Sequence, residues 1–404
     1  MNAPLTEKQL ANPLARINGW HAELTRFRQD LHAYPELGFE EHRTARVVAD
    51  ALRLLGIETH TGIGKTGVVG VIHGKFNTSG KVIGLRADMD ALPMTECNTF
   101  DHVSTVPGRM HACGHDGHTA MLLGAARYLA ATREFDGTAI LIFQPGEEGY
   151  AGARAMIQDG LFDRFPCDEV YALHNWPSLP AGKIGISPGP AMAAADRVEI
   201  TITGKGGHGA HAYLAVDPVV VAAHIITAAQ SIVSRNVNPL ESAVVSLCSM
   251  QAGTLDAMSI IPGEAKLSGT VRTFSPAVQD LVQARLKSLV ESVAAAFGAQ
   301  ATLTYTRVYP ATINHARQAN YAADVAAALV GEENLVRNLP PSMGAEDFSF
   351  MLQAKPGAYL RLGQGGAEHG KFLHNAKYDF NDAVLPLGAA LLASLATRAM
   401  RLQD

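Results

Sequence analysis

The chain has 404 residues, of which 47% are hydrophobic, so it is long enough for two or three domains and too apolar for a disordered protein. Its 33 basic and 38 acidic residues give a net charge of −5, and no run of Lys or Arg stands out. These features exclude the basic surface of a nucleic-acid-binding protein and a polybasic membrane anchor.

The start of the chain carries no transport signal that we recognise. Residues 1–20 show no charged segment followed by an apolar one, so we expect a loose lead-in and no secretory signal. No apolar run reaches the roughly 18 residues that a membrane-spanning helix needs. The four cysteines are scattered without a pairing pattern, which favours a reduced, cytoplasmic protein.

Helical and strand patterns alternate through the first half of the chain. Helical spacing of apolar residues predicts helices from His21 to Tyr34 and over 44–55, 116–132 and 151–159. Short apolar runs predict strands over 67–74, 81–89, 138–146 and 168–175. This alternation is typical of a doubly wound α/β fold with a mostly parallel sheet that is buried on both faces.

The pattern changes after a segment rich in Pro, Gly and Ala at 187–196, which we interpret as a hinge. The order strand, helix, strand, strand, helix, strand then follows over roughly 115 residues and resembles a ferredoxin-like sandwich. Near Pro310 the chain returns to the first domain, with a strand at 357–363 and a closing helix at 382–402. We therefore expect an α/β domain made of 1–189 and 309–404, with a smaller α+β domain of 190–308 inserted in it.

Polar groups that can bind metal follow three of the predicted strands. They lie in the segments Arg86 to Asp90, Gln144 to Glu148 and His174-Asn175. In open α/β sheets the ligand crevice lies outside the carboxyl ends of the strands, so we expect these groups to converge.

The densest cluster precedes the predicted helix at 116–132. It contains three histidines, a cysteine and an aspartate, at His111, Cys113, His115, Asp116 and His118. In extended backbone Cys113 and His115 point to the same side, and a thiolate with an imidazole suits zinc. The alternatives are a helix N-terminus capped by His and Asp, or a structural zinc site.

Several other residues are candidates for the site, and some of them also have a purely structural interpretation. Glu147 and Glu148 follow a buried strand and point apart, which allows one to bind metal while the other acts as a general base on water. His174 and His374 are candidate ligands, with buried hydrogen-bonded histidines as the alternative. His208 lies in a glycine-rich turn, which is either only a turn or a finger over the site.

Taken together, the motifs resemble the dinuclear metal-dependent amidohydrolases typified by hippurate hydrolase and the indole-acetyl-amino-acid hydrolases, relatives of aminoacylase and carboxypeptidase G. The matching segments span nearly the whole chain in order: RADMDALPM, MHACGHDGHTAMLLGAA, FQPGEEG, LHNWP, PGPAMAAAD, GKGGHGA, GTVRTF, GAEDFSFML and LHN. The resemblance implies two divalent metal ions, with zinc favoured and Mn, Co or Ni as alternatives. Its implied ligands are Cys113, His115, Glu148, His174 and His374.

The resemblance also implies roles for residues around the metals. Glu147 would be the general base, His208 would polarise the scissile carbonyl, and Asp88 would orient a ligand imidazole. Substrate contacts are expected at Arg272, Asn175, Ser259 and Gly344. Arg272 suits a substrate carboxylate because arginine binds carboxylates through two hydrogen bonds, and a structural ion pair is the alternative. The inserted domain would serve as a lid and as the surface of a homodimer or a dimer of dimers.

Two positions depart from the family pattern. Family members often carry a Pro-His pair where this chain has Ala212-Tyr213, and an Asn where it has Ser259. Both departures lie where the substrate would be held. The sequence predicts hydrolysis of N-acyl amino acids, with an N-acetyl amino acid deacetylase, a hydrolase of bulkier aryl amides, or a non-catalytic metal-binding relative as alternatives. No nucleic-acid or membrane partner is expected.

Overall fold

The computed structural model describes residues 12–366 and 372–402. The chain forms two compact units. The first comprises Met1–Ala191, Ile313–Pro340 and Asp347–Asp404, and the second comprises Met192–Thr312 and Pro341–Glu346. The predicted domain boundaries at 189/190 and 308/309 lie within a few residues of two of these changes, whereas the segment 341–346 was placed in the first domain.

The first unit is built on an eight-stranded sheet with the order β1-β2-β4-β3-β5-β16-β6-β15. The central strands β4, β3, β5 and β16 are all parallel, while β1 and β2 add an antiparallel edge. The strand bounds are β1 Glu58–Ile63, β2 Gly67–His73, β3 Val82–Asp88, β4 Thr138–Gln144, β5 Glu169–Trp176, β6 Ile184–Ile186, β15 Leu335–Arg337 and β16 Gly357–Gly363.

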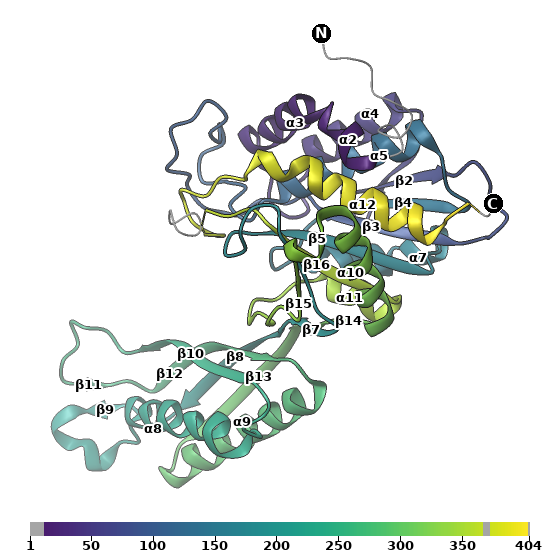
Figure 1. The fold of residues 1–404 in the computed structure, drawn as a ribbon. Helices are drawn as coiled ribbons and strands as arrows, with labels where there is room; N and C mark the ends of the chain where they lie inside the picture. Colours follow the sequence, from purple (N-terminus) through teal and green to yellow (C-terminus); the bar gives the residue numbers. More distant parts are fainter. Residues whose placement is uncertain (1–11, 367–371, 403–404) are drawn as a thin grey trace. The chain divides into compact units, whose positions relative to one another are not determined.

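The central strands are apolar because both faces of the sheet are covered. All seven residues of β4, TAILIFQ, are buried, as expected for a strand between two helical layers. Figure 1 shows α2, α3, α5 and α12 on one face and α7 and α11 on the other. The helices of this unit are α2 Pro13–Asn18, α3 His21–Ala33, α4 His42–Leu54, α5 His115–Thr132, α6 Gly152–Gln158, α7 Leu161–Arg164, α10 Ala316–Val330, α11 Phe348–Ala354 and α12 Leu385–Ala399.

The expected loose lead-in at 1–20 is partly wrong. Residues 1–11 lie outside the described residues, but α2 begins at Pro13. Asn12 caps this helix by accepting hydrogen bonds from the main-chain N–H groups of Leu14 and Ala15, and proline is favoured at the first helical position.

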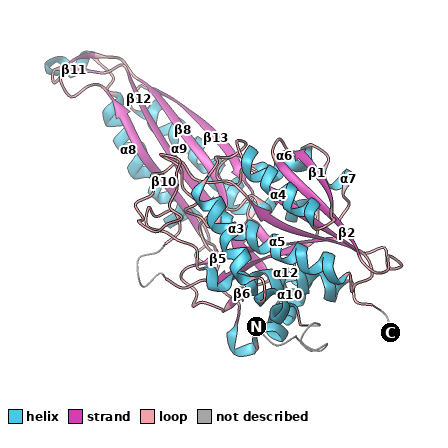
Figure 2. Ribbon diagram, turned by 90° about the horizontal axis from the view of Figure 1, so that it is seen from above, coloured by secondary structure: helices cyan, strands magenta, loops and turns pink. Residues whose placement is uncertain are grey.

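The second unit has the predicted ferredoxin-like order. Its strands are β8 Ala194–Thr203, β10 Ala243–Ala252, β12 Glu264–Thr273 and β13 Gln300–Tyr309. They pair in the order β10-β12-β8-β13, all antiparallel, with α8 Pro218–Ser231 and α9 Pro276–Ala296 along one face of the sheet (Figure 2). A small sheet of this unit pairs β9 Gly207–His208 with β11 Ile260–Ile261. Another two-stranded sheet pairs β7 Gly189–Met192 with β14 Thr312–Asn314, and most of its residues belong to the first unit.

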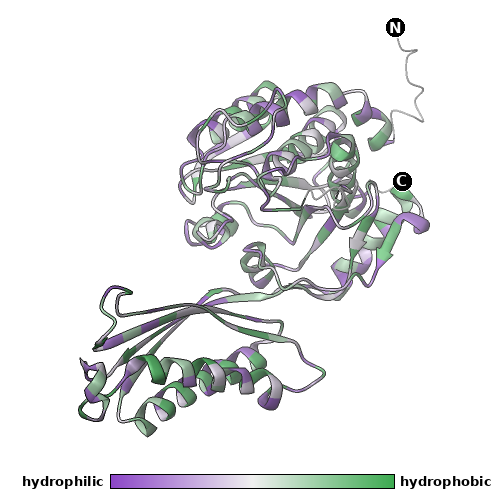
Figure 3. Cartoon of the chain, turned by 90° about the vertical axis from the view of Figure 1, so that its left-hand side faces the viewer, coloured by the Kyte–Doolittle hydropathy of each residue, from purple (hydrophilic) through white to green (hydrophobic). Residues whose placement is uncertain are grey.

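The core of the second unit lies between its sheet and its two helices. Apolar residues, green in Figure 3, recur along α8 and α9, and those that pack on the sheet include Val221, Ile225, Val282, Leu286 and Val290. The fold class predicted from the sequence, a mostly parallel α/β unit with an inserted ferredoxin-like unit, is confirmed.

Candidate metal centre

Three neighbouring strands end at one edge of the large sheet. β3 and β4 run in parallel register with Asp88 opposite Gln144, and β5 lies on the other side of β3. The turn with Glu147 and Glu148 follows β4, and His174 lies near the end of β5. The carboxyl ends of these strands therefore bring carboxylate and imidazole groups to one edge, as the strand directions predict.

Two groups of donor atoms at this edge share one thiol. One donor atom each from Cys113, His115 and His174 lie within 4.8 Å of one another, and so do those of Cys113, Glu148 and His374. The structure thus brings the five predicted ligands into two adjoining groups with Cys113 common to both. Proximity alone does not assign ligands, so the set stays a prediction.

The chain geometry around Cys113 explains how the thiol reaches this position. Gly114 follows it with a positive φ of 93°, and α5 begins at His115. A Cβ on Gly114 would lie 2.6 Å from Tyr378 Oη and 2.7 Å from Asn175 Oδ1, so only glycine fits this turn. The main-chain N–H of His374 donates to the carbonyl of Ala112, which places that histidine beside the thiol.

Main-chain carbonyls orient two of the histidines. His115 Nδ1 lies 2.8 Å from the carbonyl oxygen of Asp90, and His174 Nδ1 lies 2.7 Å from that of Asn175. Because a carbonyl only accepts hydrogen bonds, each Nδ1 carries the proton and each Nε2 keeps its lone pair, which is the tautomer that binds metal. Among the described residues His115 Nε2 is buried without a hydrogen-bond partner, and His174 Nε2 lies 3.5 Å from Cys113 Sγ.

The electrostatics of the cluster also fit a bound cation. Burial raises the pKa of the Cys113 thiol, and the negative charge of Glu148 raises it further. Burial lowers the pKa of His115, but the charges of Asp88 and Cys113 and the hydrogen bond to Asp90 together outweigh this effect and raise it overall. Burial and the nearby carboxylates thus disfavour the thiolate on their own, and a bound divalent cation would offset this effect and favour the thiolate. The donor set, with Cys113, His115 and His174 buried and His374 exposed, therefore fits a metal site.

Glu147 lies beside these groups and is only 6% exposed. Its main-chain N–H donates to Asp90 Oδ1 at 3.0 Å, and its Oε1 accepts from the main-chain N–H of Asp347 at 3.2 Å. Its carboxylate also lies within 4.8 Å of donor atoms of His115 and Glu148. A fixed carboxylate next to the donor groups is placed to exchange a proton with a nearby water.

Two other polar residues of the 111–118 cluster, His118 and Asp116, bind other side chains of the first unit, whereas the buried ring nitrogens of His111 have no hydrogen-bond partner among the described residues. Both ring nitrogens of His118 have protein partners, Asp88 Oδ1 at 2.5 Å and Asn175 Oδ1 at 2.6 Å. Asp116 binds Arg28 and His32 of α3. The N-cap residue of α5 is Gly114, which has no side chain to cap the helix, so the alternative of a His or Asp cap gains no support.

Asp88 and Asn175 both contact other buried polar side chains near the donor groups. Asp88 Oδ1 hydrogen-bonds to His118, and its Oδ2 accepts from Arg86 at 2.7 Å and lies 3.7 Å from His115 Nε2. Asn175 is fully buried, and its amide nitrogen donates to Gln364 and Tyr378. The expected substrate contact of Asn175 stays a prediction.

Four predicted residues belong to the second unit. His208 is exposed on β9, and its Nδ1 accepts from the main-chain N–H of Ala210 at 3.1 Å. Arg272 is half-buried on β12, where its guanidinium donates to Thr270 and to the carbonyl of Val271. Ser259 and Gly344 are exposed. Their expected contributions to the site stay predictions.

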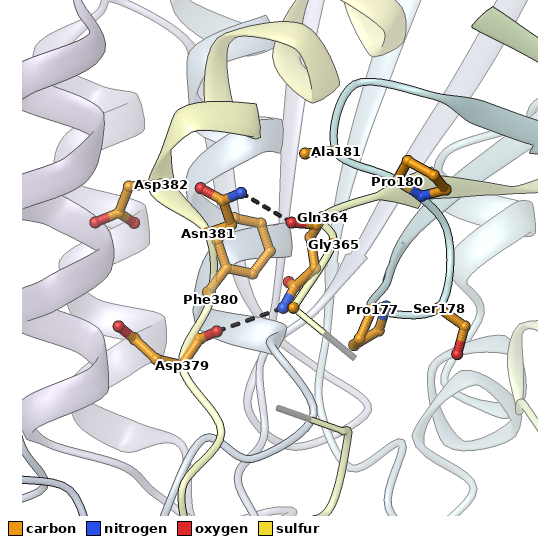
Figure 4. Close-up of a pocket in the computed structure, with 11 residues that line it drawn as sticks. Pro177, Ser178, Pro180, Ala181, Gln364, Gly365, Asp379, Phe380, Asn381 and Asp382 are labelled. Carbon is orange, nitrogen blue, oxygen red and sulfur yellow. Dashed lines mark hydrogen bonds between the residues drawn. The ribbon is translucent and has the colours of Figure 1, made fainter. Parts of the chain in front are cut away.

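A pocket of about 720 Å³ adjoins the end of β5 and β16. Figure 4 shows the side chain of Asn381 donating to the main chain of Gln364, whose own amide donates to the carbonyl of Asp379. None of the five predicted ligands lines it; the lining residues are Pro177, Ser178, Pro180, Ala181, Gln364, Gly365, Gly366, Asp379, Phe380, Asn381 and Asp382.

Asp90 is the residue of the site whose importance the sequence did not reveal. It was grouped with Asp88 at the end of a strand but received no role, although it contacts Glu147, Glu148 and His115. Two features of the sequence could have pointed to Asp90: it lies two residues after Asp88, and it directly follows a buried strand.

A mainly parallel α/β sheet with an inserted α+β unit, and sulfur, imidazole and carboxylate donors at its carboxyl edge, defines a metal-dependent hydrolase. Residues 84–398 match the model of peptidase family M20/M25/M40, and the chain belongs to this family. The family resemblance predicted from the sequence is confirmed.

Relatives cover nearly the whole chain. A hippurate hydrolase of Campylobacter jejuni is 42% identical over 390 residues, which cover 96% of this chain and 100% of the relative. An N-acetylcysteine deacetylase of Bacillus subtilis is 38% identical, covering 93% and 97%. The solved structure of the Bacillus subtilis YXEP protein, described as a dinuclear metal binding peptidase, superposes with a TM-score of 0.82 at 35% identity and covers 95% of this chain and 99% of its own.

Proposed function

We propose that this protein uses two divalent metal ions to hydrolyse the amide bond of N-acyl amino acids, releasing a carboxylic acid and a free amino acid. The observation that carries the proposal is the pair of donor groups that share Cys113, with the Glu147 carboxylate beside them. Five protein donors exceed the three of a mononuclear catalytic zinc site, which favours two ions. The similarity to the dinuclear YXEP protein supports the same number.

Thiolate and imidazole ligands favour zinc, and Mn²⁺, Co²⁺ and Ni²⁺ are the alternatives to test. When bound, the ions would supply positive charge that activates a water and polarises the scissile carbonyl. Cys113, His115 and His174 would hold one ion, and Cys113, Glu148 and His374 the other.

Glu147 provides the acid-base step. It accepts a proton from the attacking water while the water oxygen bonds to the carbonyl carbon, and it returns that proton to the nitrogen when the C–N bond breaks. The N–H group of Asp347 donates to one of its oxygens and helps to fix the position of this carboxylate.

Two residues of the second unit are assigned to the substrate. Because Nδ1 of His208 accepts a hydrogen bond, its Nε2 carries the proton and would donate to the oxyanion, from its own subunit or from a partner. Arg272 makes no ion pair with any described residue, which removes support for a structural pair and leaves its guanidinium available to a substrate carboxylate. Ser259 and Gly344 are proposed as further contacts.

The second unit is proposed to form the lid and the dimer surface of a cytoplasmic enzyme. Two helices are long and apolar enough to cross a membrane by length and composition. The one at 382–399 is 72% buried in the core, whereas the one at 218–236, which contains α8, is only 33% buried. We assign that exposed apolar helix to contact with a second copy of the chain.

A direct assay can identify the acyl group that the enzyme prefers. The similar hippurate hydrolase favours an aromatic acyl group such as benzoyl, and the similar N-acetylcysteine deacetylase favours acetyl. A panel of N-acyl amino acids that varies each half separately, with metal-reconstituted protein, distinguishes these two and a bulkier aryl amide.

The variant Glu147→Gln tests the mechanism. It keeps the shape of the side chain but cannot accept a proton, so we expect kcat to fall by more than about 10³-fold while the bound metal stays unchanged. Elemental analysis and steady-state kinetics measure the two quantities. Equal trace activity in both proteins would instead support a non-catalytic metal-binding relative.

A further inference from the structure

Carboxylates from two other segments hold the main chain of the turn that follows β4. Three consecutive N–H groups are bound: Gly146 donates to Glu41 Oε1 at 2.8 Å, Glu147 to Asp90 Oδ1 at 3.0 Å, and Glu148 to Asp90 Oδ2 at 2.9 Å. The turn therefore owes its shape to side chains from outside it. A single carboxylate, that of Asp90, fixes both glutamates of the candidate site.

Asp90 also contacts the ligand side of the site. Its main-chain carbonyl accepts from His115 Nδ1 at 2.8 Å, and its Oδ1 lies 3.3 Å from the same nitrogen. One residue thus touches a candidate ligand through its carbonyl, and the base and a second ligand through its side chain. Asp90 therefore binds both the turn after β4 and the first residue of α5.

The burial of Asp90 has a cost that its hydrogen bonds offset. The residue is 1% exposed, and no Lys or Arg in the described part of the chain forms an ion pair with it. A buried carboxylate without a cationic partner is unfavourable unless fixed dipoles stabilise it, and here two N–H groups and the His115 ring do so. Thr66 and Glu41 extend the same arrangement, since Thr66 Oγ1 donates to Glu41 Oε2 at 2.6 Å.

We infer that Asp90 is a positioning residue that sets where the Glu147 carboxylate stands relative to the ligand groups. The inference rests on the proposed function, because it assigns Asp90 to the same site. Asp90 contacts neither water nor substrate in this scheme; it acts through the main chain of Glu147 and Glu148 and through His115. A displacement of reacting groups by about 1 Å costs roughly 10²-fold in rate, which sets the size of the expected effect.

The variant Asp90→Asn tests this role without changing size. The asparagine amide keeps one oxygen that can accept a hydrogen bond from one of the two main-chain N–H groups, those of Glu147 and Glu148. Its NH₂ group faces the other N–H, so two hydrogen-bond donors oppose each other there. The carbonyl contact to His115 remains because it belongs to the main chain. We expect kcat to fall about 10²-fold with KM within threefold of the wild type, and weaker binding of the metal in a Zn²⁺ titration of the metal-free protein.

Hydrogen exchange gives a readout that needs no metal. In the metal-free wild type the amides of Glu147 and Glu148 should exchange slowly, and in Asp90→Asn at least one should exchange about tenfold faster or more. If these amides in the wild type exchange as fast as those of an exposed loop, the inference is overturned even where the variant does not fold.

The matched control is Asp136→Asn. Asp136 is also buried and binds two consecutive main-chain N–H groups, those of Thr78 and Ser79, in a different part of the first unit. This variant should speed exchange at Thr78 and Ser79 yet keep kcat within threefold. If Asp90→Asn behaves like it and keeps wild-type kcat, Asp90 is only structural; if the wild type itself hydrolyses no acyl amino acid, the proposed function fails instead.

Discussion

At the scale of single residues, the site depends on Cys113. It is the one donor common to both groups, and it is buried in a place where the pKa of its thiol is raised by burial and by Glu148. A neutral thiol is a poor ligand, so metal binding and loss of its proton must occur together. Metal affinity at this site should therefore rise with pH.

Replacing Cys113 by alanine should lower the number of bound metal ions, because both groups lose a donor at once. Elemental analysis of protein loaded with Zn²⁺ measures this number directly. Cys167→Ala is the matched control, since Cys167 is also buried and free but belongs to no donor group of the described residues. An unchanged metal count in the Cys113 variant would contradict its assignment as a shared ligand.

The residue types that bind metal could be predicted from the sequence, while the residues that orient them could not. Cys113 and His115 stand out because of their spacing, and Glu147 and Glu148 because they follow an apolar strand. The anchors of the two imidazoles are main-chain carbonyls, which every residue carries, so no side-chain pattern marks them. The role of Asp90 depends on the pairing of β3 with β4, because this pairing brings Asp90 next to the turn with Glu147 and Glu148.

At the scale of elements, α3 and α5 are joined by buried charges close to the site. Arg28 and His32 of α3 both contact Asp116, the second residue of α5. Burial lowers the pKa of His32, but the hydrogen bond and charge of Asp116 and the hydrogen bond to Glu96 together outweigh this effect and raise it to about 9. The protonated imidazole therefore holds the start of α5, and with it His115, against the rest of the unit.

This pair predicts a pH dependence of stability. Because the folded pKa of His32 lies above its ordinary 6.5, its contribution of about 3 kcal/mol is complete below about pH 6.5 and is lost as the pH rises through about 9. Urea unfolding of the metal-free wild type and of His32→Asn at pH 6, 8 and 10 measures it. The difference in unfolding free energy should shrink towards pH 10; a constant difference would show that His32 is neutral in the folded protein.

Strongly apolar elements could be predicted from the sequence, but half-exposed ones could not. β4 could be predicted because a strand that is buried along its whole length has a continuous apolar sequence. β1, with the sequence ETHTGI, was missed because it is an edge strand with mostly exposed polar residues. α10 was missed as well; its buried face is made largely of alanines, which give a weak amphipathic signal.

At the scale of the whole molecule, the chain crosses between its two units more often than the sequence suggests. The residue composition and pattern change at the hinge near 187–196 and again near Pro310, where the chain returns to the first unit. The segment 341–346 joins the second unit through contacts such as the bridge between Met192 and Ser342, which are far apart in sequence. No composition change marks a segment of this length, so its place could not be read from the sequence.

The exposed apolar surface of the second unit leads to the last prediction. On α8, Val220 is 45% exposed, and β10 lies at an edge of its sheet with Met250 42% exposed. An apolar helix beside an open strand edge is stable in water when a partner covers it, and a second copy would do so through the same surface.

We therefore expect the wild type to be a dimer and Val220→Glu to shift it towards monomers, because the glutamate would bury a charge between two copies. Light scattering coupled to size-exclusion chromatography over a range of protein concentrations measures the mass. The control is Lys287→Glu, an exposed position on α9 that should leave the mass unchanged. A monomeric wild type, or an unchanged mass in the Val220 variant, would place the contact elsewhere; if the monomeric variant also loses turnover while its metal content is unchanged, the catalytic His208 is supplied by the partner subunit.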